Sequence, residues 1–273
     1  MNKKLKITLI TVVILTLCTL AALLILKLSG SKLNKPESIV YDPIGDRFLI
    51  SNVGSGSIVA LDSKGKYMDY MPKALNSPKG MALRDDMLFV CEPNRIAAID
   101  VSEAKIVSYY DIEGARALND IALDEYGVIY ATDTEMNCVW IYNPKDGSTE
   151  KVMSQLFNKP NGIYYDRPRW QMFVVNFAER SPVMSLDVRD KKVSIFMDSV
   201  YSQLDGIAVD DLGRIFISSW AEQMIIEIPQ EQNRFLVRKT GLKSPANLYY
   251  HLPTNELLVP LFNKNKIERI QLD

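Results

Sequence analysis

The chain has 273 residues, of which 47% are hydrophobic, and its 32 basic and 33 acidic residues give a formal net charge of −1. Both signs of charge are interspersed along the chain, which argues against a nucleic-acid groove or a polybasic membrane patch. The length, with 13 glycines and 13 prolines, favours one large all-β domain over several small ones.

The first 27 residues differ in composition from the rest of the chain. Residues 7–26 carry no charge and lie between Lys6 and Lys27. Twenty helical residues at ~1.5 Å each span the ~30 Å of a bilayer's hydrocarbon core. We therefore expect residues 1–27 to form an N-terminal membrane anchor, with a cleaved signal sequence as the alternative, and residues 28–35 to form a linker. The numbers of lysines on the two sides of this segment are nearly equal, so the charge bias that orients a membrane span is small. We expect the N-terminus inside the cell and the remaining chain outside the cytoplasm, or secreted if the segment is cleaved.

From residue 36 onward the sequence repeats with a period near forty. Successive repeats are spaced by 42, 40, 42, 44 and 41 residues. Their first segments read PESIVYD from Pro36, PKGMALR from Pro78, LNDIALD from Leu118, PNGIYYD from Pro160, LDGIAVD from Leu204 and PANLYYH from Pro245. A period of about forty with roughly four short strands per unit is typical of a β-propeller. We predict an all-β, six-bladed β-propeller over residues 36–273.

The third repeat shows the unit most clearly, and the sixth is the shortest. Residues 118–133, LNDIALDEYGVIYATD, read as a hairpin with its turn at residues 125–127. The sixth repeat ends after three strands. Closing the ring with a borrowed strand would require residues 29–34, which are few and polar, so we expect a weak closure.

Two sets of residues should surround one mouth of this propeller. The first strand of a blade starts at the face where the antiparallel second strand ends. The starts of the first strands define a first ring: Glu37, Lys79, Asn119, Asn161, Asp205 and Ala246. The ends of the second strands define a second ring: Asn52, Glu92, Asp133, Asn176, Ser219 and Leu261. Phe177, Trp220 and Phe262 directly follow the second ring and would make one side of the mouth aromatic.

Four residues of the first ring resemble the metal ligands of a known family. Glu37 opens the first blade, Asn119 lies in Asn-Asp, Asn161 in Pro-Asn-Gly and Asp205 in Asp-Gly. In this order they resemble the gluconolactonase/regucalcin (senescence marker protein/luciferin-regenerating enzyme) propellers, and the resemblance covers residues 36–273. It implies a divalent cation on the propeller axis. Two carboxylates and two amide oxygens suit Ca²⁺, with Mg²⁺, Mn²⁺ or Zn²⁺ as alternatives. The competing interpretation is that Asn, Asp and Gly recur here because they form turns.

Three features depart from that family pattern. Lys79 stands in the first ring, where its ammonium would repel a dication, hold an anionic substrate group, or simply be a surface lysine. Ala117 occupies the place at which sugar-lactone hydrolases of the family often carry an arginine, which argues against sugar lactones. The single histidine, His251, ends an innermost strand and is expected at the far face, as a structural residue.

Two functions follow from these observations. The first is a divalent-metal-dependent hydrolase of a lactone or other ester, with Asp133, Asp120 or Asp205 as the catalytic acid or base. Substrate-binding candidates are Lys79, Asn52, Glu92, Asn176, Trp220, Phe177 and Phe262. The second is a non-catalytic extracytoplasmic propeller that binds a ligand or partner, as NHL-repeat proteins do, and a strictosidine-type condensation is a third alternative. We expect a monomer that contacts a small-molecule substrate and, through its N-terminal helix, a membrane, but no nucleic acid.

Overall fold

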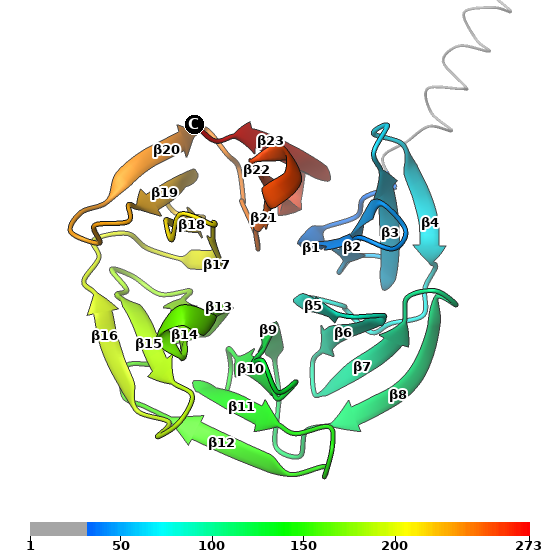
Figure 1. Ribbon diagram of the computed structural model, residues 1–273, viewed down its shortest axis with the longest axis horizontal. Coiled ribbons are helices and arrows are strands. Elements are labelled where there is room, and N and C mark those ends of the chain that lie inside the picture. The colour runs from blue at the N-terminus through cyan, green and yellow to red at the C-terminus, as the bar shows by residue number, and fades with distance from the viewer. Residues whose placement is uncertain (1–31) are drawn as a thin grey trace, which may run out of the picture. The chain divides into compact units, whose positions relative to one another are not determined.

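The computed structural model describes residues 32–273, and Figure 1 shows them as a ring of six sheets around a central axis. Five sheets have four strands, and the sixth, formed by the C-terminal residues, has three. The predicted six-bladed propeller and the short sixth blade are both confirmed. The predicted membrane anchor at residues 1–27 lies outside the described residues. Within the described part, no helix has the length and apolar character that crossing a membrane requires.

Each blade is an antiparallel meander whose strands run outward from the axis in chain order. The strands are β1 Pro36–Asp42, β2 Arg47–Asn52, β3 Ser57–Asp62 and β4 Tyr67–Met71 in blade 1; β5 Met81–Arg84, β6 Met87–Glu92, β7 Arg95–Asp100 and β8 Lys105–Asp111 in blade 2; β9 Leu118–Leu123, β10 Ile129–Asp133, β11 Cys138–Tyr142 and β12 Thr149–Met153 in blade 3; β13 Pro160–Asp166, β14 Gln171–Asn176, β15 Val183–Asp187 and β16 Val193–Met197 in blade 4; β17 Leu204–Val209, β18 Ile215–Ser219, β19 Met224–Ile228 and β20 Leu236–Thr240 in blade 5; and β21 Tyr249–His251, β22 Glu256–Leu261 and β23 Lys266–Gln271 in blade 6. Three 3₁₀ helices of three residues each, η1 Arg167–Arg169, η2 Leu252–Thr254 and η3 Phe262–Lys264, complete the described elements.

The hydrophobic core is divided into six clusters, one at each seam between neighbouring blades. The middle strands of each blade are covered on both faces by adjacent blades, which explains continuous apolar runs such as FLIS and IVAL in place of strict alternation. The outermost β8, by contrast, alternates exposed and partly buried residues. Cys91 and Cys138 lie in the cluster between blades 2 and 3 as buried free thiols.

The seam between blades 6 and 1 is closed by residues 33–35, which are not a strand. Leu33 is only 2% exposed and belongs to the apolar cluster shared by these two blades. The Lys35 amide donates to Asn265 Oδ1 of blade 6 at 2.7 Å, and the Val53 amide of blade 1 donates to the Lys35 carbonyl at 3.1 Å. Within the described residues, the apolar side chain of Leu33 and the flanking hydrogen bonds of Lys35 therefore join blade 1 to blade 6.

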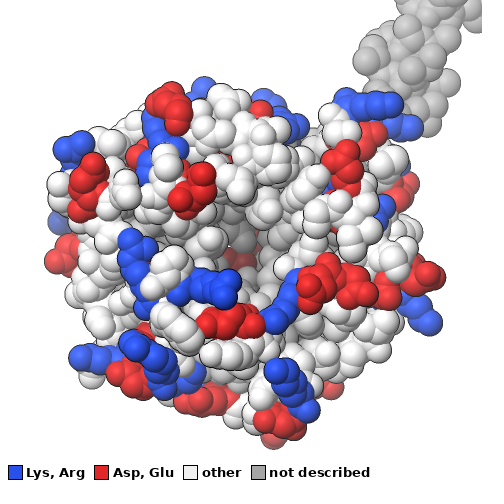
Figure 2. All heavy atoms as spheres, viewed as in Figure 1, with Lys and Arg blue, Asp and Glu red and all other residues white. Residues whose placement is uncertain are grey.

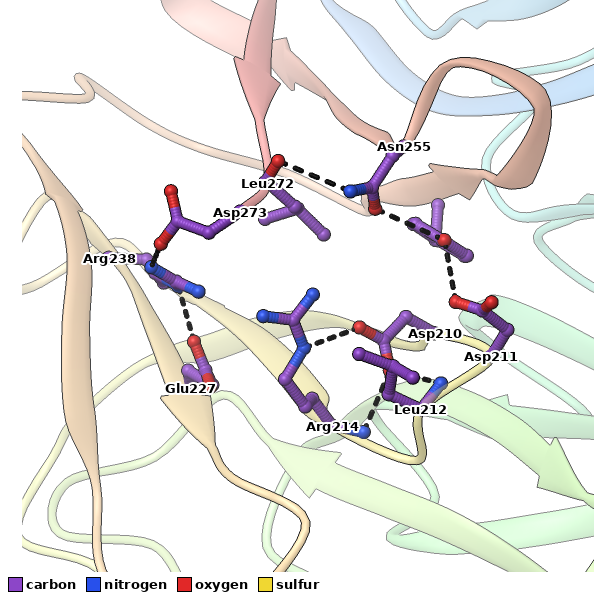
Figure 3. A network of polar contacts seen from close by, with 10 residues as sticks. Asp210, Asp211, Leu212, Arg214, Glu227, Arg238, Asn255, Leu272 and Asp273 are labelled. Atoms are coloured by element: carbon purple, nitrogen blue, oxygen red, sulfur yellow. Dashed lines mark hydrogen bonds and ion pairs between the residues drawn. The ribbon is translucent and has the colours of Figure 1, made fainter.

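The C-terminus fastens blade 6 to blade 5 on the other side (Figure 3). Arg238 of β20 forms ion pairs with Glu227 and with the side chain of Asp273, the latter at 2.8 Å. The amide of Leu272 donates to the Asn255 carbonyl at 2.9 Å, and Asn255 Nδ2 donates to the Leu272 carbonyl at 3.2 Å. Both neighbours of the three-stranded blade are therefore joined to it by polar contacts.

Candidate functional site

The six residues of the first ring all line one cavity on the propeller axis, which we call the axial cavity. Its volume is about 220 Å³. Besides Glu37, Lys79, Asn119, Asn161, Asp205 and Ala246, its lining consists of Val53, Thr134, Phe177, Trp220 and Phe262. The predicted aromatic side of the mouth is present, because Trp220 packs against Phe177 and Phe262 with ring centroids 5.6 and 5.7 Å apart.

The four predicted metal ligands each lie at an irregularity in the pairing of an innermost strand. In blades 1, 3, 4 and 5 the register with the second strand shifts at the residue pairs that begin with Glu37, Asn119, Asn161 and Asp205. A β-bulge of this kind bends the strand and redirects a side chain. The glycines that follow two of the ligands permit close contact between blades: a Cβ on Gly162 would lie 2.4 Å from the Asp205 carbonyl oxygen, and one on Gly206 would lie 2.5 Å from Asn247 Cα.

Neighbouring blades hold the backbone carbonyls of several ring residues. Thr132 Oγ1 of blade 3 donates to the Asn161 carbonyl at 2.5 Å. The Gly80 amide of blade 2 donates to the Asn119 carbonyl at 2.8 Å, and the Asn247 amide of blade 6 donates to the Glu37 carbonyl at 3.0 Å. These bonds fix the starts of innermost strands against one another, so the ring is organised by the fold itself.

Three oxygens of the predicted ligands are buried without a hydrogen-bond partner: Glu37 Oε2, Asn119 Oδ1 and Asp205 Oδ1. Each buried polar atom without a hydrogen-bond partner lowers the stability of the fold by about 1–3 kcal/mol. Three such oxygens in one cavity are therefore best explained by a bound partner that is not part of the chain. Within residues 32–273, no three or more His, Cys, Asp or Glu side chains are grouped so that they could hold a metal ion without other ligands. The donor set of carboxylate and amide oxygens therefore fits a hard cation such as Ca²⁺ better than Zn²⁺.

The two carboxyl groups of this set favour their protonated forms. Burial raises the pKa of Glu37 well above its usual range, and the charges of Asp205 and Asp120 raise it further, while Lys79 lowers it. Burial, followed by the charge of Asp120, raises the pKa of Asp205 to about 8, again opposed by Lys79. A cavity that disfavours two negative charges in this way gains from a cation that replaces the protons.

The second ring lies outside the axial cavity, contrary to its predicted place at the mouth. Its residues instead bind the backbone segment that leads into the innermost strand of their own blade. Asn52 Oδ1 accepts from the Asn34 amide, Glu92 Oε1 accepts from the Asn76 amide, and Asn176 Nδ2 donates to the Leu156 carbonyl. All three are fully buried, so the structure does not bring the predicted substrate-binding residues Asn52, Glu92 and Asn176 to the cavity.

Asp133 is the most fully engaged residue of this second ring. Its carboxylate accepts hydrogen bonds from the amides of Arg116 and Ala117, from the two amides that follow Thr134, and from Trp140 Nε1. Five donors hold this carboxylate in one position. Asp133 therefore anchors a loop. The sequence had suggested that it moves a proton in the axial cavity, but the structure does not place it there.

Asp120 lies on the axis behind Asn119 and faces away from the axial cavity. Its Oδ1 accepts from Asn247 Nδ2 at 2.8 Å and its Oδ2 accepts from the Ile163 amide at 2.9 Å. Burial raises its pKa to about 7. The residue lines a second, larger cavity on the opposite side of the ring. His251, expected at that far face, is buried, and its Nδ1 lies 2.8 Å from Thr254 Oγ1.

The sequence had not identified Val53, Thr134 and Asn247. Val53 and Thr134 come one residue after the second-ring residues of their blades, as the three aromatic residues do in theirs. The side chains that reach the cavity are therefore those one residue beyond the second ring, and not those of the ring itself. Asn247 directly follows the first ring in blade 6, at the place of Asp120 in blade 3. Asn247 could have been found from the sequence, because a polar residue there occupies the same repeat position as Asp120.

The fold and the site together define a class of protein: six-bladed propellers with a ring of oxygen ligands at the start of the innermost strands. The chain belongs to the SMP-30/Gluconolactonase/LRE-like family, whose model matches residues 35–258. The recognition of this family from the four ring residues is thereby confirmed. A search of curated proteins gave no match.

Solved structures of several activities share the fold. A gluconolactonase from Xanthomonas campestris is 15% identical, with a TM-score of 0.75, over 89% of this chain and 88% of that one. Virginiamycin B lyase from Staphylococcus aureus, solved with quinupristin, is 15% identical with a TM-score of 0.69, over 89% and 83% of the two chains. A chain of a nidogen/laminin complex is 14% identical with a TM-score of 0.65, over 80% of this chain and 91% of that one. At these identities the likeness concerns the fold, which serves both enzymes and binding proteins.

Proposed function

We propose that the protein is a divalent-metal-dependent hydrolase of a lactone or another small ester, with its reaction centre in the axial cavity. The observation that carries the proposal is the set of three unpaired buried oxygens on Glu37, Asn119 and Asp205. Asn161 would complete the set of ligands. Membership of a family that contains gluconolactonases supports hydrolysis as the reaction.

The residues of the cavity have separate roles in this proposal. A bound cation would polarise the ester carbonyl and lower the pKa of water. Asp205 lines the cavity and would be ionised as a ligand of that cation, so a carboxylate oxygen that does not contact the cation could accept the proton that is released when water attacks. Trp220 directs its indole N–H toward the Asp205 carboxyl and could donate it to a polar group of the substrate, and Phe177 and Phe262 beside it contact the apolar part and exclude water. Lys79 binds the carboxylate that ester hydrolysis produces.

A second candidate rests on Lys79 itself, whose ammonium shares a 220 Å³ cavity with the proposed metal ligands. In a non-catalytic extracytoplasmic propeller this ammonium would capture an anionic ligand, and the metal would only stiffen the ring. The two functions differ in whether any substrate is turned over.

The test uses purified full-length protein. Calorimetry with Ca²⁺ and Mn²⁺ is combined with hydrolysis assays on a panel of aliphatic lactones and aryl esters. Asp205→Ala should weaken metal binding and hydrolysis together, since one of two negative charges of the proposed shell is lost. Asp146→Ala, in an exposed turn of blade 3, is the matched control and should change neither. Metal binding without hydrolysis of any panel member would favour the binding function.

A further inference from the structure

The larger cavity opens on the face opposite the axial cavity, and we call it the turn-face cavity because the hairpin turns after the innermost strands surround it. Its volume is about 700 Å³, within the ~300–1,000 Å³ of ligand-binding pockets. Figure 2 shows this face with a hollow at its centre and acidic atoms in its depth. Neither the proposed hydrolysis nor the metal ligands involve this cavity.

The wall of the turn-face cavity is apolar and aromatic. Residues from all six blades line it, and most are aliphatic. Five tyrosines contribute to the lining: Tyr41, Tyr164, Tyr165, Tyr249 and Tyr250. Three of their hydroxyls are already bonded to carboxylates of neighbouring turns, namely Tyr41 to Asp46, Tyr165 to Glu125 and Tyr250 to Asp211. The tyrosine rings are therefore held in place, as apolar surfaces with an electron-rich face.

The charges that line the cavity are all negative. Asp85 lies at its mouth with a side chain 88% exposed, Asp120 is 2% exposed at its floor, and no Lys, Arg or His lines it. Among the described residues Asp120 has no ion-pair partner, and its carboxylate accepts hydrogen bonds from Asn247 Nδ2 and from the amides of Ile163 and Ile121. The two oxygens of a carboxylate together offer about four acceptor sites, so the group retains capacity for a further donor. A buried carboxylate without a cation is unfavourable, and a positively charged ligand would compensate it.

We propose that the turn-face cavity binds a small amine with an apolar body, whose ammonium contacts Asp120 and whose body lies among the tyrosines. Ammonium groups hydrogen-bond to carboxylates and are attracted to the faces of aromatic rings. The aliphatic wall accommodates the rest of the molecule. An anionic ligand of the same shape is disfavoured by Asp120, which has no cationic partner, whereas Asp85 at the mouth is ion-paired with Arg84.

The discriminating probes are three molecules of one shape: 4-phenylbutylamine, 4-phenylbutan-1-ol and 4-phenylbutanoate. Their binding to full-length protein is measured by calorimetry. The amine should bind at least ~10-fold more tightly than the alcohol, since hydrogen bonds between two charged groups are stronger than those of a neutral hydroxyl, and the acid should not bind. Asp120→Asn keeps the shape of the side chain and should reduce amine affinity to that of the alcohol, whose own affinity stays unchanged. Equal affinity of wild type for amine and alcohol, or an unchanged amine affinity in Asp120→Asn, would overturn the proposal.

Two further variants locate the probe. Ala82→Trp places an indole into the turn-face cavity, which Ala82 lines, and should block the amine and the alcohol alike. Asp205→Ala leaves every residue that lines the turn-face cavity unchanged and should not weaken amine binding, because the carboxylate of Asp120 is retained and a neighbouring carboxyl that competes for ionisation is removed. Loss of amine binding in folded Asp205→Ala, with retention in folded Ala82→Trp, would place the amine in the axial cavity and refute the proposal. None of these outcomes depends on whether the protein hydrolyses esters.

Discussion

Asn247 Nδ2 donates a hydrogen bond of 2.8 Å to Asp120 Oδ1 across the propeller axis, joining residues that are 127 positions apart in the chain. The same amide nitrogen lies 3.4 Å from Ser38 Oγ of blade 1, and Ser38 Oγ accepts from the Met81 amide of blade 2 at 3.2 Å. Residues of blades 1, 2, 3 and 6 are thus linked on the axis, directly behind the first ring.

Removing the donor at the centre of this network should destabilise the propeller. Asn247→Leu leaves a buried carboxylate oxygen of Asp120 without its partner, which costs about 1–3 kcal/mol of unfolding free energy. Urea denaturation followed by fluorescence measures the loss. Asn143→Leu, which removes an asparagine bond at an exposed turn, serves as control and should cost under ~0.5 kcal/mol. Equal stability of the two variants would show that the bond across the axis contributes nothing.

The affinity for a divalent cation should depend on pH. Binding requires both carboxylates of the shell to be ionised, and Asp205 has a pKa of about 8 without metal. Affinity should therefore rise from pH 6 to pH 8 by up to ~10-fold per unit for each proton displaced. Calorimetry in buffers of different ionisation enthalpy counts these protons. A pH-independent affinity over this range would mean that the carboxyls are not ligands.

The metal-free protein should lose stability over the same range. In the folded state the pKa values of Asp205 and Asp120 are about 8 and about 7, whereas an unfolded Asp has a pKa near 3.9. Because the folded state binds more protons, their contribution is complete below the unfolded pKa and is lost as pH rises through 7 to 8. Thermal melts in chelator should show a higher Tm at pH 5 than at pH 8, and saturating Ca²⁺ should raise Tm most at pH 8. A metal-free Tm that climbs toward pH 8 would contradict the buried, protonated carboxyls.

Asp133 should matter for stability and not for chemistry. Asp133→Ala removes the acceptor of four backbone amides and one indole and should cost ~3–5 kcal/mol, the usual price of breaking a buried network. Where the variant remains folded, its metal affinity and its turnover per folded molecule should match wild type. A loss of ~10² or more in turnover with an unchanged unfolding curve would restore the catalytic role that the sequence suggested.

Lys79 should oppose the metal. Lys79→Met keeps the apolar stem and removes a positive charge from the cavity that holds Glu37 and Asp205. Divalent-ion affinity should rise by ~3-fold or more, in keeping with ~1 kcal/mol between charges in a partly screened site, while inhibition by small carboxylates should weaken. Isothermal titration and inhibition assays measure the two effects. Lys243→Met, on a surface loop, provides the control, and unchanged metal affinity in both variants would mean that Lys79 does not influence the shell.

The repeat predicted the first ring because two local signals coincide there. A bulge needs particular residues at the start of each innermost strand, and in blades 4 and 5 the glycines after Asn161 and Asp205 permit the close approach of the next blade. Both requirements act within two residues of the ligand, so they are written in short motifs. The second ring was misplaced because side chains alternate along a strand: Asn176 ends β14 pointing into the blade, and Phe177 after it faces the axis.

Contacts across the axis could not be predicted in this way. Whether Asn247 reaches Asp120 depends on the diameter of the ring and on the relative height of blades 3 and 6, neither of which any single repeat encodes. The closing segment was missed for a related reason. A ring normally closes through strand pairing, but here one apolar side chain, Leu33, fills the seam between blades 6 and 1.

The seam between blades 6 and 1 can form only after blade 6 has been synthesised. The Lys35 amide donates its hydrogen bond to Asn265, which is 230 residues later in the chain. At ~5–20 residues per second, the ribosome needs roughly 10–50 s to synthesise the residues between them. During that interval the nascent chain is an open arc whose first edge, including Phe48 and Ile50, has no neighbour. A chain that stalls before β23 leaves that edge exposed, and exposed apolar surface of this kind promotes aggregation until blade 6 is complete.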